Sequence, residues 1–181
     1  MAESPFSRTD ITTAMFTTVG QLSVNWSLME FTINALVAII FKSFDGQKIL
    51  ETLPWEFTKK TRFLREWLKT KPDVVKDIQA NLLAELDRVG SIVQYRDDVI
   101  HGHLSAYDDE TKTITFIVID RDNEKTTHLT RERKVTAMKL LEVGVEAGEI
   151  GHNLVNVVVG LIGIAYGPDE ANNLLSKLTR K

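Results

Sequence analysis

The sequence predicts an all-α protein, an antiparallel four-helix bundle with a small antiparallel β-meander inserted between its third and fourth helices. Apolar residues recur at intervals of three and four over most of the 181 positions, which is the period of an amphipathic helix. Over about residues 103–130 the interval falls to two, which indicates strands. Because the chain shows no repeat, low-complexity tract or linker, we expect residues 1–181 to form a single domain.

The first three helices are predicted from apolar stripes and from the residues that interrupt them. The first helix is expected over residues 9–43, where the sequence KSFDGQ ends it. Pro54 opens the second helix, which is expected over residues 55–70. The sequence KTKPD breaks the chain again, so the third helix is expected to begin near Asp73 and to end at His101.

The meander is predicted around KTITFIVID, in which Ile114, Phe116 and Val118 occupy one face. The segments LSAY and KTTHLT are expected to be its neighbouring strands, joined by polar turns. The helical period returns near Arg133 and stops at YGPDE, after which a short helix ends the chain. The fourth helix carries glycines that predict either close contact with another backbone or a break, namely Gly144, Gly148, Gly151, Gly160 and Gly163.

Composition excludes several kinds of site and location. The chain has no cysteine, so it has no disulfide, no thiolate zinc site and no cysteine nucleophile. The net charge of −3 argues against a protein that coats nucleic acid, although a local basic face remains open. The first ten residues lack a signal-peptide pattern, and the apolar runs Ile33–Phe41 and Leu154–Tyr166 are too short to span a membrane. We therefore expect a cytoplasmic protein with no membrane partner.

The stretch YRDDVIHGHL at the end of the third helix carries the most suggestive chemistry. Arg96 lies within the apolar stripe, and His101 is the expected last helical residue, since Gly102 is typical of the position after a helix. Asp97 precedes His101 by four residues, the favourable order for an acid–base pair. An arginine can hold a phosphate with two hydrogen bonds, and a histidine can transfer protons near neutral pH. Asp97 could orient the ring.

These groups suit the cleavage of RNA, in which the neighbouring 2′-OH attacks the scissile phosphate. That reaction needs proton transfer and charge stabilisation, and it needs neither a metal nor another cofactor. A structural alternative is open. Asp97 and His101 can form a surface pair, and Arg96 can be neutralised in the core by Glu30, which lies one turn after Trp26 in the first helix.

The motif RDDVIH lies at the end of a third helix, and its last residue begins the dipeptide HG; it resembles the Arg-x4-His motif of the HEPN superfamily. The long first helix, VGQLSVNWSLMEFTINALVAI, looks like that of compact bacterial HEPN-like proteins. The resemblance covers the four helices and implies a homodimer in which two motifs face each other. Many members are metal-independent endoribonucleases, often toxins, defence proteins or RNA-processing factors. An antitoxin or another neighbouring protein is therefore an expected partner.

Carried over to this sequence, the resemblance implies a role for each motif residue. Arg96 would bind and stabilise the scissile phosphate, and His101 would be the acid–base residue. Asp97 would fill a polar position that the family often gives to Asn. Apart from the resemblance, Tyr95 and His103, which flank the motif, are expected to be structural or site-supporting, as is Glu30. Some members lack nuclease activity and act as interaction or nucleotide-binding modules, in which case Arg96, Glu30 and His101 would be structural.

Two further features have functional alternatives. His101 and His103 with a nearby aspartate could bind a metal if His128 or His152 supplied another ligand. No complete ligand spacing is present, so no metal is expected, and His152 is expected in the core.

The second helix is strongly basic, with only Glu66 opposing its cations. Its candidate RNA-binding residues are Lys59, Lys60, Arg62 and Arg65, with Lys69 and Lys71 beyond them and Trp55, Phe57 and Trp67 available for stacking on bases. The alternative is a solvated basic face with these aromatic residues in the core.

Overall fold

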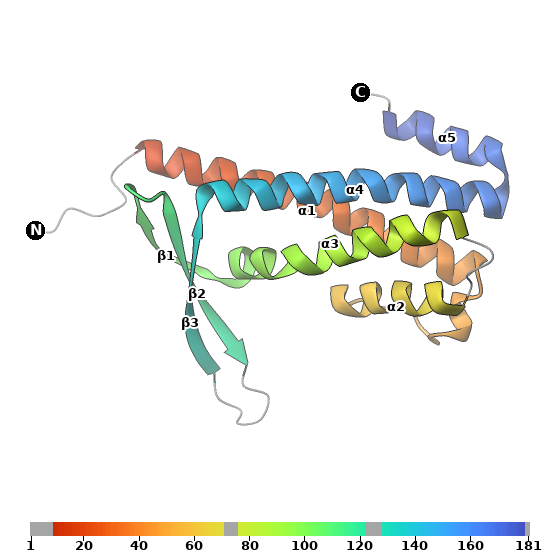
Figure 1. Ribbon diagram of the computed structural model, residues 1–181, viewed down its shortest axis with the longest axis horizontal. Coiled ribbons are helices and arrows are strands. Elements are labelled where there is room, and N and C mark those ends of the chain that lie inside the picture. The colour runs from red at the N-terminus through yellow and green to blue at the C-terminus, as the bar shows by residue number, and fades with distance from the viewer. Residues whose placement is uncertain (1–8, 71–75, 122–127, 180–181) are drawn as a thin grey trace, which may run out of the picture. The chain divides into compact units, whose positions relative to one another are not determined.

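The computed structural model describes residues 9–70, 76–121 and 128–179, which are mostly helical and include a small three-stranded antiparallel sheet (Figure 1). The helices are α1 (Thr9–Ser43), η1 (Gly46–Lys48, a 3-10 turn), α2 (Phe57–Thr70), α3 (Lys76–His101), α4 (Ala137–Tyr166) and α5 (Pro168–Thr179). The strands are β1 (His103–Asp108), β2 (Thr113–Arg121) and β3 (His128–Thr136).

The predicted element types and their order are confirmed, with a sheet that follows the third helix along the chain. The third helix ends at His101, as expected, whereas its predicted start near Asp73 lies outside the described residues. The prediction that the helical period returns near Arg133 is wrong, because β3 continues to Thr136 and α4 begins only at Ala137. The meander is therefore longer at its C-terminal end than the predicted 103–130.

The sheet has the strand order β1-β2-β3, and its register explains the length of β3. Ile114, Phe116 and Val118 of β2 are buried on one face, as predicted. Their partners on β3 are Val135, Arg133 and Arg131 in that order. The segment RERKV thus alternates as a strand does, but two of its inward positions are arginines, which the hydrophobic pattern cannot recognise.

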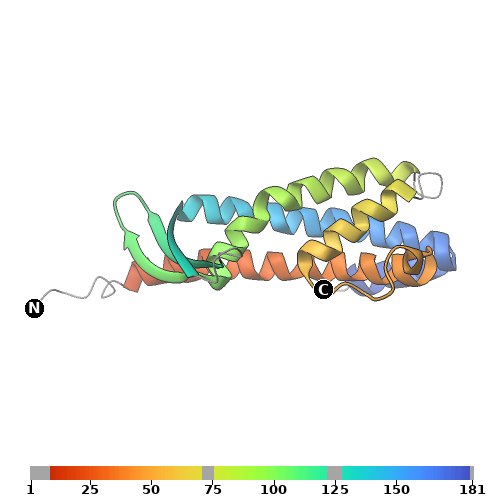
Figure 2. The ribbon, with the colours of Figure 1, turned by 90° about the horizontal axis from the view of Figure 1, so that it is seen from below.

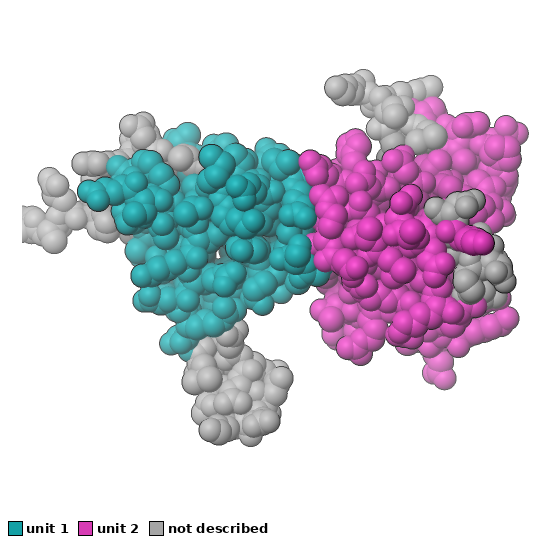
Figure 3. All heavy atoms as spheres, in the orientation of Figure 1, with its two compact units in different colours: residues 1–26, 90–147 teal, residues 27–89, 148–181 magenta. Residues whose placement is uncertain are grey.

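Contacts divide the chain into two compact units (Figure 3). Unit 1 comprises residues 1–26 and 90–147, and unit 2 comprises residues 27–89 and 148–181. The core of unit 1 includes Leu22, Trp26, Ile92, Ile114, Phe116, Leu140 and Val143. The core of unit 2 includes Met29, Ile33, Leu36, Phe63, Leu64, Trp67, Leu82, Leu86, Leu154 and Leu161. The expectation that residues 1–181 form a single domain stays a prediction.

Glycines of α4 allow close contact with the backbone of another helix. This was one of the two predicted alternatives, the other being a break in the helix. In unit 1, a Cβ at Gly144 would lie 3.2 Å from the Cα of Leu22, and the Gly144 carbonyl accepts a 2.9 Å hydrogen bond from Asn25. In unit 2, a Cβ at Gly151 would lie 3.1 Å from the backbone nitrogen of Met29. The helix is continuous from Ala137 to Tyr166, so the glycines do not break it.

Among the described residues, two helices are long and apolar enough to cross a membrane by length and composition alone, Met15–Ser43 within α1 and Ala137–Tyr166. The sequence prediction considers only the apolar runs Ile33–Phe41 and Leu154–Tyr166, each interrupted by one asparagine, whereas both helices begin well before these runs. Buried residues make up 44% and 39% of their most apolar windows. Core helices of globular proteins pass the same test, so the location of the protein stays a prediction.

Gly102 is the single residue between α3 and β1, and its junction has no room for a side chain. Its N–H donates a 3.0 Å hydrogen bond to the carbonyl of Asp98. A Cβ would lie 2.1 Å from that carbonyl oxygen and 3.1 Å from the Cβ of Phe116. Among the described glycines, Gly167 after α4 has a positive φ of 96° and Gly102 does not, so the requirement at Gly102 is steric.

We expect Gly102→Ala to lower the free energy of unfolding by about 1–3 kcal/mol, because the backbone must move to relieve the overlap. Urea denaturation measures the change. Gly90→Ala is the matched control, since Gly90 lies inside α3 and a Cβ there meets nothing within 4 Å. The control is expected to gain about 0.5–1 kcal/mol of stability from helix propensity. Equal stabilities for the two variants would contradict the steric requirement at Gly102.

Candidate active site

The structure brings together the three motif residues that the sequence predicts. Arg96 Nη1 donates a 2.9 Å hydrogen bond to Asp97 Oδ1 and lies 3.3 Å from His101 Nε2. A guanidinium can only donate, so the ring nitrogen in this contact is the acceptor. His101 is exposed at the end of α3 in unit 1. The arrangement therefore presents an arginine and a histidine side by side on an accessible helix end.

Asp97 takes a different place from the expected one. Its carboxylate contacts the guanidinium of Arg96, and the guanidinium contacts the ring of His101. Asp97 therefore acts on the histidine through Arg96 rather than by a direct acid–base pair. The Asp97 side chain is nearly half exposed, so solvent screens its ion pair with Arg96.

The guanidinium of Arg96 is held from its inner side as well. Its Cζ lies 5.6 Å from the centre of the Trp26 ring, within the range of a cation–π interaction. Its Nε is buried and has no hydrogen-bond partner among the described residues. The predicted position of Arg96 within the apolar stripe is consistent with this burial. Trp26 therefore restricts the directions in which Arg96 can point.

The predicted core pair of Glu30 with Arg96 is replaced by separate partners. Glu30 belongs to unit 2, where its carboxylate lies 4.0 Å from the Nζ of Lys60. Lys60 is buried. Arg96 belongs to unit 1 and pairs with Asp97 there. Glu30 therefore contacts α2 and does not neutralise Arg96.

A buried carboxylate behind the motif was missed by sequence reasoning. Asp98 is 1% exposed, and its Oδ1 accepts hydrogen bonds from Gln94 Nε2 at 2.9 Å and Arg131 Nη2 at 3.1 Å. Arg133 Nε lies 3.0 Å from the Oδ2, an ion pair without the alignment of a hydrogen bond. Asp98 thus joins α3 to β3. The available signal was the spacing of Arg131 and Arg133, which places two charges on the inward face of one strand.

Tyr95 supports the same junction. The guanidinium of Arg133 lies 5.1 Å from the centre of the Tyr95 ring, and the Nζ of Lys139 lies 5.8 Å from it. Tyr95 thus links α3 to β3 and to the first turn of α4. The structure is consistent with the site-supporting role expected for this residue.

The sequence left open a metal site at the histidines outside the motif. Among the described residues there is no group of three or more His, Asp or Glu side chains that could hold an ion. His103 is exposed on β1, and the side chain of His128 lies outside the described part of the chain. The prediction that His152 is a core residue is wrong, because it is exposed on α4. The apolar stripe of the helix predicts a position near the core for His152, but its side chain lies in solvent between the buried Gly151 and Leu154.

The basic residues of α2 divide into exposed and buried members. Lys60 is buried against Glu30, so its predicted place on an RNA-binding surface is wrong. The amines of Lys59 and Lys69 lie 2.6 and 2.8 Å from Glu56 and Glu66, respectively. Arg65 lies 2.8 Å from Asp87, and Arg62 has no ion pair among the described residues.

The aromatic residues predicted to stack on bases differ in exposure. Trp67 is buried, Phe57 is half-buried and Trp55 is exposed. The remaining predicted cation, Lys71, lies outside the described residues.

The chain was compared with known proteins in three ways. No protein-family model, curated protein or solved structure matches it. The resemblance to the HEPN superfamily therefore rests on the motif and on its place at the end of α3. Any function assigned to the chain must therefore be argued from the chemistry of these residues.

We expect Asp98→Asn to lower the free energy of unfolding by about 2–4 kcal/mol. The substitution removes the negative charge that faces Arg131 and Arg133, and the cost is reduced because these guanidiniums are about one third exposed. Chemical denaturation measures the change. Asp97→Asn is the control at the neighbouring position, and its half-exposed pair is expected to contribute less than about 1 kcal/mol. Similar losses in both variants would show that Asp98 has no special role.

Proposed function

We propose that the protein is a metal-independent endoribonuclease of the HEPN type, with Arg96 and His101 at its active site. The observation that carries this proposal is the 3.3 Å approach of Arg96 Nη1 to His101 Nε2 at an exposed helix end. One side chain supplies a fixed positive charge for a phosphate, and the other supplies an imidazole nitrogen that can accept a proton. Both lie within a single segment of α3.

In the proposed reaction, His101 takes the proton of the 2′-OH, and the resulting oxygen attacks the adjacent phosphorus. The bond from phosphorus to the 5′-oxygen breaks, and that oxygen receives a proton. The products are a 2′,3′-cyclic phosphate and a free 5′-hydroxyl. Arg96 stabilises the extra negative charge on the phosphate oxygens in the transition state. A phosphate that enters the site takes the place of the half-exposed Asp97 at Nη1.

One histidine must act first as a base and then as an acid, whereas a homodimer would supply two. We therefore propose that α1–α4 form an antiparallel HEPN-like bundle and that two copies place their motifs at a shared cleft. Exposed apolar side chains of unit 1 support an association surface. Phe16 and Val24 of α1 are 72% and 68% exposed, and Met138 of α4 is 64% exposed. The proposed setting is the cytoplasm, with an antitoxin or a neighbouring protein as a further partner.

Light scattering during size-exclusion chromatography is expected to give about twice the 20.5 kDa mass of one chain. Burial of the exposed apolar side chains of α1 and α4 provides the driving force. Phe16→Ser should shift the equilibrium toward the single chain without unfolding it, because this side chain lies outside the core. A mass of one chain at high micromolar concentration would refute the dimer.

A second candidate function is a non-catalytic module of the same fold, which binds a partner protein or a nucleotide. The contacts of Arg96 with Asp97 and with the Trp26 ring favour this alternative, because they satisfy the guanidinium without a substrate. In such a module Arg96 and His101 would be structural, with Glu30 fixing α1 against α2 through Lys60. The two candidates differ in whether loss of the imidazole removes an activity.

The deciding experiment incubates mixed RNA with wild type and with His101→Ala in excess chelator, followed by analysis of the cut ends. Wild type is expected to leave 2′,3′-cyclic phosphates, and the variant to cut about 10²–10⁴-fold more slowly, the usual contribution of a general acid–base group. His152→Ala is the control, an exposed histidine of α4 that lies outside the motif and should retain activity. Circular dichroism confirms that both variants fold.

Three results would count against the nuclease. Equal cleavage by wild type and His101→Ala would assign the activity to a contaminant. Cleavage abolished by the chelator would make the reaction metal-dependent. An equal loss in His152→Ala would point to a general loss of folded protein instead of a role for the His101 ring.

A further inference from the structure

Unit 2 contains a groove between α2 and the first half of α3. The two helices lie side by side (Figures 1 and 2), and Gln79 of α3 donates a 3.3 Å hydrogen bond to the carbonyl of Leu68. The groove has a volume of about 540 Å³, within the range of small-ligand sites. Its walls carry hydroxyl, basic and apolar side chains, namely Thr58, Thr61, Arg62, Arg65, Leu68, Lys69 and Leu83.

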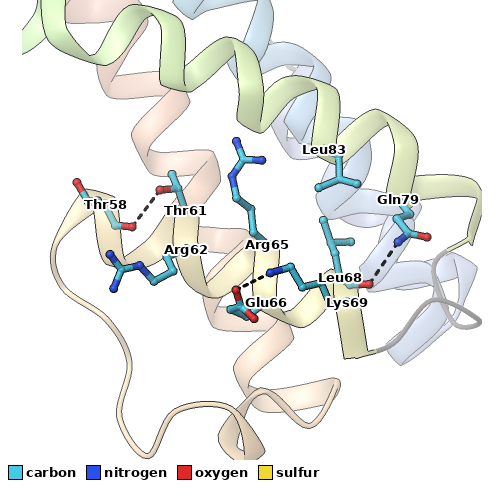
Figure 4. A pocket seen from close by; sticks show the side chains of 9 residues that line it. All are labelled: Thr58, Thr61, Arg62, Arg65, Glu66, Leu68, Lys69, Gln79 and Leu83. Atoms are coloured by element: carbon cyan, nitrogen blue, oxygen red, sulfur yellow. Dashed lines mark hydrogen bonds and ion pairs between the residues drawn. The ribbon is translucent and has the colours of Figure 1, made fainter.

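The groove is positively charged although the chain as a whole is acidic. Three cations line it against one carboxylate, that of Glu66 (Figure 4). Arg62 has no ion pair among the described residues, and the partner of Arg65 is Asp87, whose side chain is 72% exposed. Lys69 pairs with Glu66, which is half exposed. Exposed ion pairs of this kind are weak, so a phosphate can replace the carboxylates.

The cations are arranged as a track rather than as a single point. Arg62, Arg65 and Lys69 follow one another at intervals of three and four, so they lie along one face of α2. Figure 4 shows Arg65 extending from α2 toward α3, with Arg62 one turn earlier on the same helix. The hydroxyls of Thr58 and Thr61 continue the line toward the start of α2. This spacing suits successive phosphates of an extended chain.

An exposed tryptophan, Trp55, precedes the residues of this track in the sequence. Trp55 is 89% exposed and lies three residues before Thr58, which lines the groove. The other two tryptophans, Trp26 and Trp67, are buried. Bases of any sequence can stack on an exposed aromatic ring of this kind.

We infer that the groove between α2 and α3 binds single-stranded RNA, with a base stacked on Trp55 and backbone phosphates on Arg62, Arg65 and Lys69. A basic track with a stacking ring beside it is the combination that single-stranded nucleic acid requires. An acidic peptide would use the cations and would leave the indole without a partner. The choice of RNA over DNA rests on the proposed nuclease function, whereas the groove belongs to unit 2 and the Arg96–His101 motif to unit 1.

The test measures binding in a background that cannot cut. His101→Ala, in excess chelator, is titrated with a fluorescently labelled 12-nucleotide single-stranded RNA of mixed sequence, and anisotropy and tryptophan fluorescence are recorded. Trp55→Ala and Arg62→Ala are added to this background. Lys48→Ala is the matched control, since Lys48 is an exposed cation of unit 2, in η1, that does not line the groove.

Trp55→Ala is expected to raise Kd about tenfold, which corresponds to the loss of one stacked base. RNA should quench the tryptophan emission of the parent, and this quench should disappear in Trp55→Ala. Arg62→Ala should weaken binding and lower the slope of log K against log salt by about 0.7, the contribution of one phosphate contact. Lys48→Ala should bind as its parent does. Duplex RNA and an equal nucleotide concentration of AMP or inorganic phosphate should fail to compete.

Several outcomes would overturn the inference. Equal Kd values for the Trp55, Arg62 and Lys48 variants would place any RNA elsewhere. Effective competition by AMP or phosphate would make the groove a site for a free anion, and competition by a duplex would exclude stacking. Because the background does not cut, these results are independent of the nuclease test. Cleavage by wild type together with unchanged binding by the groove variants would retain the nuclease and refute the groove.

Discussion

The carboxylate of Asp98 is the interaction on which the geometry of unit 1 depends. It is buried at the last turns of α3, and it faces two arginines of β3, the strand that leads directly into α4. An apolar contact in its place could exclude water equally well, but it would not fix direction as strongly as hydrogen bonds and ion pairs do. Asp98 therefore helps to fix the position of the Arg96–His101 pair, although it need not touch any substrate.

The same chemistry has opposite consequences at adjacent positions of the sequence. Asp98 is buried and faces two cations, so its charge holds helix and strand together. Asp97 is half exposed and faces one cation, so its contact with Arg96 can be exchanged for another anion. In the free protein Asp97 keeps the guanidinium close to His101. Under the proposed mechanism a phosphate replaces it, and the arginine is already in place.

Periodicity predicts the helices well because their apolar stripes are long, and it locates the end of α3 because Gly102 follows His101. It fails where charges are buried. Arg131 and Arg133 look like the polar start of a helix, although they occupy inward positions of β3. The role of Asp98 depends on partners that lie 33 and 35 residues later, a separation that spacing along a helix cannot reveal. Lys60 was assigned to the surface by its type, whereas its burial depends on Glu30 of another helix.

Because a single residue separates α3 from β1, the end of α3 that carries His101 is coupled to the sheet. A longer connection would let a helix end fray while the strands stay paired. Here the N–H of Gly102 donates a hydrogen bond to the Asp98 carbonyl, and β1 begins at the next residue, His103. Helix end and sheet are thus one cooperative element, which opens as a whole. The ring of His101 is exposed, so the junction couples the backbone: the last amides of α3 are expected to exchange with solvent together with those of the strands.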